Sequence, residues 1–138
     1  MRFFYFRSRE IYQEIRDRTF ELLKPYLKRK SGSTWKCMLC PFYAHKGWTR
    51  GERKYLTKVG VLNHFSILHP EVFREARKRA IAEAVRRHKY ISLYPFSKSD
   101  REAAEEIAKE HGDIGIATMR VRGKEVTYLY HSSLFEEE

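Results

Sequence analysis

The sequence is poor in amide and thiol side chains and has no long hydrophobic run. Its 138 residues include two cysteines, one glutamine (Gln13) and one asparagine (Asn63). No run of about 18 apolar residues occurs, which excludes a transmembrane helix. The apolar stretch Phe3–Phe6 is too short for the core of a signal peptide, so we expect an intracellular, cytoplasmic protein. Few thermolabile amides together with 33% charged residues are typical of a thermophilic source.

Positive charge is unevenly distributed along the chain. Residues 1–90 hold 22 Lys and Arg against 8 Asp and Glu, a net charge of +14, whereas residues 91–138 hold 6 against 10, a net charge of −4. The charged residues of helices often do no more than face solvent. That explanation suits an even mixture of positive and negative charges better than such an excess of positive charge. A strongly basic surface is typical of proteins that bind nucleic acid, so we expect a nucleic acid as the partner.

The two cysteines and two of the histidines have a spacing suited to a metal ion. Two residues lie between Cys37 and Cys40, 23 residues lie between Cys40 and His64, and four residues lie between His64 and His69. Residues five apart on a helix can reach one ion from adjacent turns. Two thiolates and two imidazoles form the closed tetrahedral set of structural zinc. We therefore predict one structural Zn²⁺, which would stabilise a segment too small to fold by burial alone.

Other roles for the cysteines fit the sequence less well. A redox Cys-x2-Cys pair needs a helix that starts at the first cysteine, whereas Pro41 follows the second and residues 31–34 form a loop pattern before the first. A disulfide between Cys37 and Cys40 would close a very small loop and leave the histidines unexplained. His45 is the competing ligand, and we expect it to lie in a loop.

The segment at about residues 34–70 resembles a single, elongated Cys2His2 zinc finger. As in that family, Trp35 stands two residues before the first cysteine and Val61 three residues before the first histidine. The interval between the ligand pairs is longer than the usual interval of about 12 residues, as in BED-type fingers. The resemblance implies a DNA-binding transcriptional regulator, with DNA favoured over RNA. More loosely, the chain is similar to small zinc-finger regulators of archaeal viruses, which would place it in a host cytoplasm.

Base recognition by such a finger is expected to be weak here. In the family's register the reading positions are Thr57, Gly60 and Asn63, and a glycine has no side chain with which to read a base. The insertion 45–55 is basic with interleaved aromatic residues that can meet phosphates and stack on bases, although Trp48 could equally pack on the finger. We predict largely backbone-directed contacts by Lys46, Trp48, Arg50, Arg53, Lys54, Lys58, Asn63, Arg74, Arg77 and Lys78.

The hydrophobic pattern predicts an α+β fold in three segments. An N-terminal strand and helix occupy residues 1–33, the finger occupies 34–70, and a basic helix with a small α/β segment occupies 71–138, which can pack with 1–33 as one domain. The finger is thus flanked by basic amphipathic helices. A β-α-β-β segment follows the second of them.

Local signals predict the element boundaries. The aromatic run Phe3–Phe6 indicates a short strand or docking segment, and Ser8 is expected to start the helix that follows it. Pro25 is expected to break or restart that helix. Residues 28–33 are then expected to form a basic helix end that continues into a linker. Thr57 is expected to cap the finger helix. Further along, we expect a helix at 71–89, a strand at 90–94, a helix from Ser97 or Ser99 to His111, and strands at 114–121 and 125–130 joined by a turn at 122–124.

No catalytic pattern stands out, so we predict that the protein is not an enzyme. The sequence has no Ser-His-Asp order with supporting context, no phosphate-binding glycine loop and no carboxylate pair suited to acid–base chemistry. The rival function is a zinc-finger adaptor that binds a protein instead of nucleic acid. A homodimer would be one way for a single finger to gain sequence specificity.

Overall fold

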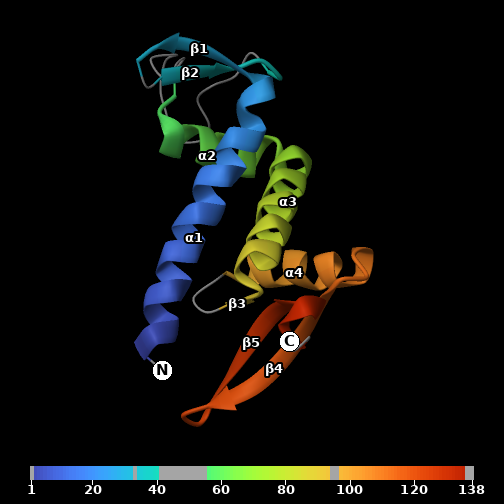
Figure 1. Cartoon of the computed structure of the whole chain (residues 1–138). Coiled ribbons are helices and arrows are strands. Elements are labelled where there is room, and N and C mark those ends of the chain that lie inside the picture. Colours follow the sequence, from blue (N-terminus) through green and yellow to red (C-terminus); the bar gives the residue numbers. More distant parts are fainter. Residues whose placement is uncertain (1, 33, 41–55, 94–96, 136–138) are drawn as a thin grey trace. The chain divides into compact units, whose positions relative to one another are not determined.

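The computed structural model describes residues 2–32, 34–40, 56–93 and 97–135 (Figure 1). These residues form a mixed helix-and-strand structure, which confirms the α+β class. The elements in chain order are α1 (Arg2–Leu23), η1 (Lys24–Tyr26), β1 (Leu27–Ser31), β2 (Thr34–Cys37), α2 (Lys58–Leu68), α3 (Pro70–His88), β3 (Tyr90–Ser92), α4 (Lys98–Glu110), β4 (Ile114–Val121), β5 (Lys124–His131) and η2 (Ser132–Phe135).

The chain divides into two compact units. Unit 1 consists of residues 1–17 and 77–138, and unit 2 consists of residues 18–76. The unit boundaries fall inside α1 and α3. A helix that looks like one element in the sequence therefore supplies side chains to two separate cores.

Unit 2 is built on a β-hairpin and on helix α2. Strands β1 and β2 are antiparallel, with Leu27 opposite Cys37 and Lys28 opposite Lys36. Gly32 has a φ of 49°, a left-handed conformation that glycine adopts without strain in the tight turn. The Thr57 side chain accepts a hydrogen bond from the Gly60 N–H, so the predicted cap of α2 is confirmed. Apolar side chains from α1, β2, α2 and α3, together with Leu56 just before α2, form one core: Phe20, Leu23, Cys37, Leu56, Val61, Leu62, Phe65 and Ala76.

Unit 1 contains a three-stranded antiparallel sheet in the order β3-β5-β4. Of the two predicted caps of α4, Ser97 and Ser99, it is Ser97 that caps the helix, because its hydroxyl accepts a hydrogen bond from the Asp100 N–H. Arg122 and Gly123 have φ values of 53° and 80°, as expected for the tight hairpin turn between β4 and β5. The predicted β-α-β-β order is thus confirmed for the described residues. Ile81, Val85, Ile91, Ile107 and Leu129 are among the fully buried side chains of this unit.

Two predictions for the N-terminal segment are wrong. Phe3–Phe6 lies inside α1 and is not a strand, because aromatic residues only weakly disfavour a helix and the downstream helical pattern prevails. Ser8 is therefore an interior residue of α1 and not its cap. Pro25 does end the helix, but residues 28–31 then form β1, because after η1 the backbone pairs with β2.

Candidate metal centre

The two cysteines are positioned by a tight turn at the end of β2. Cys37 is the last residue of that strand, and the Met38 N–H donates a hydrogen bond to the Tyr26 carbonyl at 2.9 Å. The Leu39 N–H then donates to Cys37 Sγ at 3.3 Å, which turns the chain so that Cys40 lies beside Cys37. Neither cysteine forms a disulfide.

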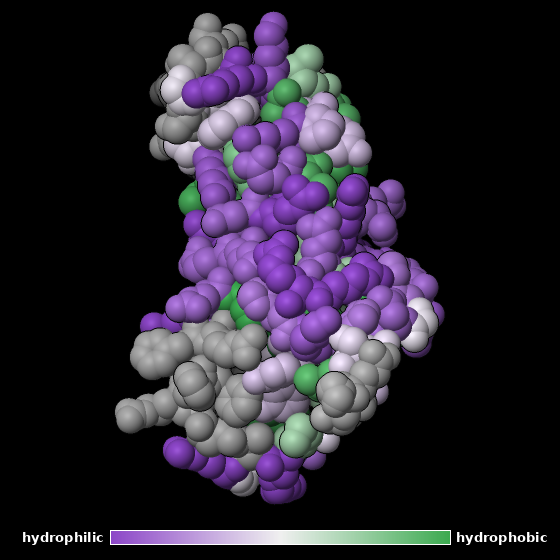
Figure 2. Space-filling view, in the orientation of Figure 1, coloured by the Kyte–Doolittle hydropathy of each residue, from purple (hydrophilic) through white to green (hydrophobic). Residues whose placement is uncertain are grey.

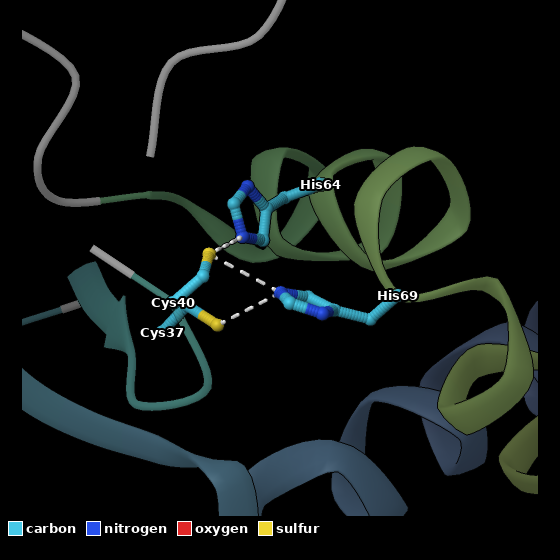
Figure 3. A group of neighbouring side chains, drawn as sticks. All are labelled: Cys37, Cys40, His64 and His69. Atoms are coloured by element: carbon cyan, nitrogen blue, oxygen red, sulfur yellow. Dashed lines mark hydrogen bonds between the residues drawn. The ribbon is translucent and has the colours of Figure 1, made fainter. Parts of the chain in front are cut away.

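The two histidines come from α2 and from its C-terminal end. His64 lies within the helix, whereas His69 is the C-cap, with φ −133° and ψ 58°. Pro70 disfavours a helical conformation at the preceding residue, so the chain turns at His69. The His69 N–H still donates to the Phe65 carbonyl at 2.9 Å. This turn brings the fifth residue after His64 to the same point as the cysteines (Figure 3).

The four side chains converge on one point. Cys40 Sγ lies 3.5 Å from His64 Nε2 and 3.3 Å from His69 Nε2, and Cys37 Sγ lies 3.5 Å from His69 Nε2. All four ligand atoms lie within 4.8 Å of one another. The arrangement can hold one metal ion, and it is formed by the four residues predicted from the sequence spacing.

Burial sets the electrostatics of the site. His64 is fully buried and Cys37 is 3% exposed. Burial raises the pKa of the Cys37 thiol; the Leu39 N–H lowers it in part, and the neighbouring Cys40 raises it again. Burial lowers the pKa of His69 and so favours the neutral imidazole, the form that binds a metal. The buried Cys37 thiol, which has Cys40 beside it, is therefore costly to ionise unless a cation lies next to it.

Aromatic side chains pack around the ligands. The Phe65 ring lies 5.1 Å from the His69 ring and 5.7 Å from the His64 ring, and Trp35 meets Phe20 edge to face at 4.9 Å. Trp35 and Val61, the two apolar positions singled out in the sequence, both contribute to the unit 2 core. The ligands are thus held by packing as well as by the backbone.

The candidate nucleic-acid contacts are distributed over different parts of the structure. Five of the candidate contacts and the competing ligand His45 lie outside the described residues; the five are Lys46, Trp48, Arg50, Arg53 and Lys54. Of the three candidates of unit 2 that are described, Asn63 is exposed on α2, while Lys58 and Arg74 are half-buried. Lys58 Nζ lies 5.6 Å from the centroid of the Phe20 ring.

Arg77 and Lys78 are placed in unit 1 and are 7% and 6% exposed. Arg77 binds Asp100, and Lys78 binds Glu106 and Glu110, in each case between α3 and α4. The expectation that these two side chains contact phosphates is therefore not supported, because their charges are already neutralised. The reason is that α4 supplies carboxylates to α3, a pairing that the linear pattern does not reveal.

The division into units changes the distribution of charge. Unit 2 contains 12 Lys and Arg against 4 Asp and Glu, a formal charge of +8, whereas unit 1 contains 16 against 14, a formal charge of +2. The predicted contacts do not include the cations of the β1–β2 hairpin, because Lys28 and Arg29 belong to a basic run that resembles a helix end. The signal that could have found them is the turn pattern Ser31-Gly32-Ser33, which can join two short strands.

Hydrophilic residues cover most of the face of the molecule seen in Figure 2. Within the described parts of the chain, no helix combines the length and the apolar character needed to cross a membrane. Comparison of the chain with protein-family models, with curated proteins and with solved structures finds no match.

Proposed function

We propose that the metal held by Cys37, Cys40, His64 and His69 is a structural Zn²⁺. Zn–S bonds of about 2.3 Å and Zn–N bonds of about 2.0 Å in a tetrahedron separate sulfur from nitrogen by about 3.5 Å. Three S···N distances of 3.3–3.5 Å match that edge length. With four protein ligands no coordination position remains open for a substrate, so the ion has a structural and not a catalytic role.

The zinc-stabilised unit 2 binds nucleic acid. The observation that carries this proposal is the formal charge of +8 on unit 2, which holds most of the excess charge of +10 of the whole chain. In unit 1 the cations of α3 are largely paired with carboxylates, as at Arg77 and Asp100. The charge that remains for a polyanion is therefore concentrated around the metal centre.

The contacts are largely to the nucleic-acid backbone. Of the positions that read bases in a Cys2His2 finger, Thr57 uses its hydroxyl to cap α2 and Gly60 has no side chain, which leaves Asn63. The resemblance to Cys2His2 fingers favours DNA over RNA and a role as a transcriptional regulator. A phosphate-directed protein of this kind binds many sequences with similar affinity.

The test is the salt dependence of binding to a labelled DNA duplex, measured by fluorescence anisotropy. A protein that neutralises about six phosphates loses roughly a thousandfold in affinity between about 50 and 200 mM salt. A flat salt dependence, or no binding at low salt, would exclude the nucleic-acid function. Metal analysis of the same preparation is expected to give one equivalent of zinc per chain.

An adaptor that binds another protein is the second candidate. It is favoured by apolar side chains exposed beside the ligands: Met38 is 58% exposed, Leu39 43% and Ile67 56%. Association through these side chains would be nearly independent of salt, because it would bury apolar surface and release few counterions. The same salt titration therefore separates the two functions.

A further inference from the structure

Two lysines lie directly opposite each other in the β1–β2 hairpin. Lys28 of β1 pairs with Lys36 of β2 in the antiparallel register. Side chains at such opposed positions point to the same face of the sheet, with Cβ atoms about 5 Å apart. Lys28 is exposed and Lys36 is half-buried.

The alternation of the strands points this pair away from the unit 2 core. The neighbouring pair, Leu27 and Cys37, points the other way, because successive residues of a strand face opposite sides. Cys37 belongs to the core and Leu27 packs against it. The face that carries Lys28 and Lys36 is therefore the outer face of the hairpin.

Folding does not require two cations at these positions. Like charges directly opposite each other destabilise a hairpin, whereas a Lys–Glu pair would stabilise it. Among the described residues neither Lys28 nor Lys36 forms an ion pair, in contrast to the cations of α3. A cross-strand repulsion that folding leaves in place is relieved when an anion lies between the two ammonium groups.

We infer, on the basis of the proposed nucleic-acid binding, that the outer face of the β1–β2 hairpin binds the phosphate backbone of the nucleic acid through Lys28 and Lys36. The hairpin is fixed to the metal centre, since Cys37 ends β2 and the Met38 N–H bonds to the Tyr26 carbonyl just before β1. Metal binding thus fixes the position of both lysines. The bound chemistry is a phosphodiester, not a particular base.

The experiment compares three double variants with the parent protein. Lys28→Gln/Lys36→Gln removes both charges, and Lys28→Arg/Lys36→Arg keeps them. Arg122→Gln/Lys124→Gln, at exposed positions of the β4–β5 hairpin, removes two charges from unit 1 as a matched control. The probe is a fluorescein-labelled duplex of about 20 bp, titrated at several salt concentrations. Zinc content and circular dichroism establish that each variant is folded.

The Gln pair at positions 28 and 36 is expected to reduce the salt slope by about 2 and the affinity at low salt by tenfold to a hundredfold. The Arg pair and the unit 1 control are expected to bind like the parent. If the parent binds and the hairpin variant binds equally well with the same slope, the hairpin assignment is wrong while the proposed function stands.

If the parent does not bind the duplex at all, the proposed function itself fails, and the hairpin assignment with it. Competition by polyglutamate of matched charge tests the preference for phosphate. If polyglutamate displaces the labelled duplex as effectively as unlabelled DNA does, the preference for phosphate is overturned.

Discussion

Arg77 and Asp100 form a bidentate ion pair inside unit 1. Arg77 Nε lies 3.0 Å from Asp100 Oδ1, and Arg77 Nη2 lies 3.0 Å from Asp100 Oδ2, with side chains 8% and 10% exposed. The Arg77 guanidinium also lies 5.2 Å from the centroid of the Tyr12 ring. In the sequence, the basic residues of α3 suggest a helix that binds a polyanion. In the structure, some of these residues hold α4 in place.

Removal of one partner of this pair is expected to be costly. Asp100→Ala leaves a buried guanidinium without its carboxylate, and we expect the free energy of unfolding to fall by about 3–5 kcal/mol. The double variant Arg77→Met/Asp100→Leu replaces the pair with apolar side chains of similar size and is expected to be clearly more stable than the single variant. Urea denaturation measures both. A double variant no more stable than Asp100→Ala would contradict a role based on charge pairing.

Loss of one metal ligand is expected to unfold unit 2. Structural zinc contributes about 10 kcal/mol or more to small zinc-binding domains at neutral pH, and the core of unit 2 is small. His64→Asn should therefore remove the metal and the amide protection of residues 56–68, as measured by metal analysis and hydrogen exchange. His111→Asn, which removes a half-buried histidine of unit 1, is the matched control and should retain one equivalent of metal. Full protection in the metal-free His64 variant would show that the core alone stabilises the unit.

Lys36→Glu is expected to change stability and binding in opposite directions. A carboxylate opposite Lys28 replaces a repulsion with an attraction, which should stabilise the hairpin by about 0.2–1 kcal/mol. The same change places a negative charge where we propose a phosphate binds, so the affinity for a DNA duplex should fall. Thermal unfolding and anisotropy measure the two effects on one sample. A variant that gains stability and keeps its affinity would argue against a phosphate at this face.

The stability of unit 1 is expected to depend on the ionised form of Asp113. The Arg86 guanidinium, which donates two hydrogen bonds to this carboxylate, holds its pKa at about 2, below the ordinary 3.8. Because the pKa is lower in the folded state, the stabilisation is present above about pH 4 and is lost as the pH falls towards 2. Amide protection of β4 and β5 should therefore differ between the parent and Asp113→Asn most clearly near pH 6 and least near pH 2. Glu125→Gln, at an exposed position of β5, should show no such dependence.

Local chemistry made the metal site and several boundaries predictable. A tight turn brings Cys37 beside Cys40, and α2 with its C-cap brings His64 close to His69, so each pair of ligands is set within its own segment. The caps at Thr57 and Ser97 are likewise set by the side chain and the backbone three residues away. Such features need no knowledge of the rest of the fold.

Contacts between distant segments were not predictable in the same way. Residues 28–31 form a strand only because they pair with 34–37, and on their own they resemble a basic helix end. Asp100 lies 23 residues beyond Arg77 in the sequence, so nothing in the neighbourhood of Arg77 indicates that its charge is neutralised. The sequence therefore indicates how much charge is present, and only the fold indicates which charges remain unneutralised.

The backbone bridge between Trp35 and Leu56 bears on how the long interval in the zinc ligand pattern is accommodated. The Trp35 N–H donates to the Leu56 carbonyl at 2.8 Å, and the Leu56 N–H donates to the Trp35 carbonyl at 2.6 Å. The chain therefore leaves the centre at Cys40 and returns at Leu56, beside the same strand, before α2 starts. Backbone contacts within unit 2 thus fix the chain just before and just after the interval, so the ligand geometry does not itself require the usual interval of about 12 residues.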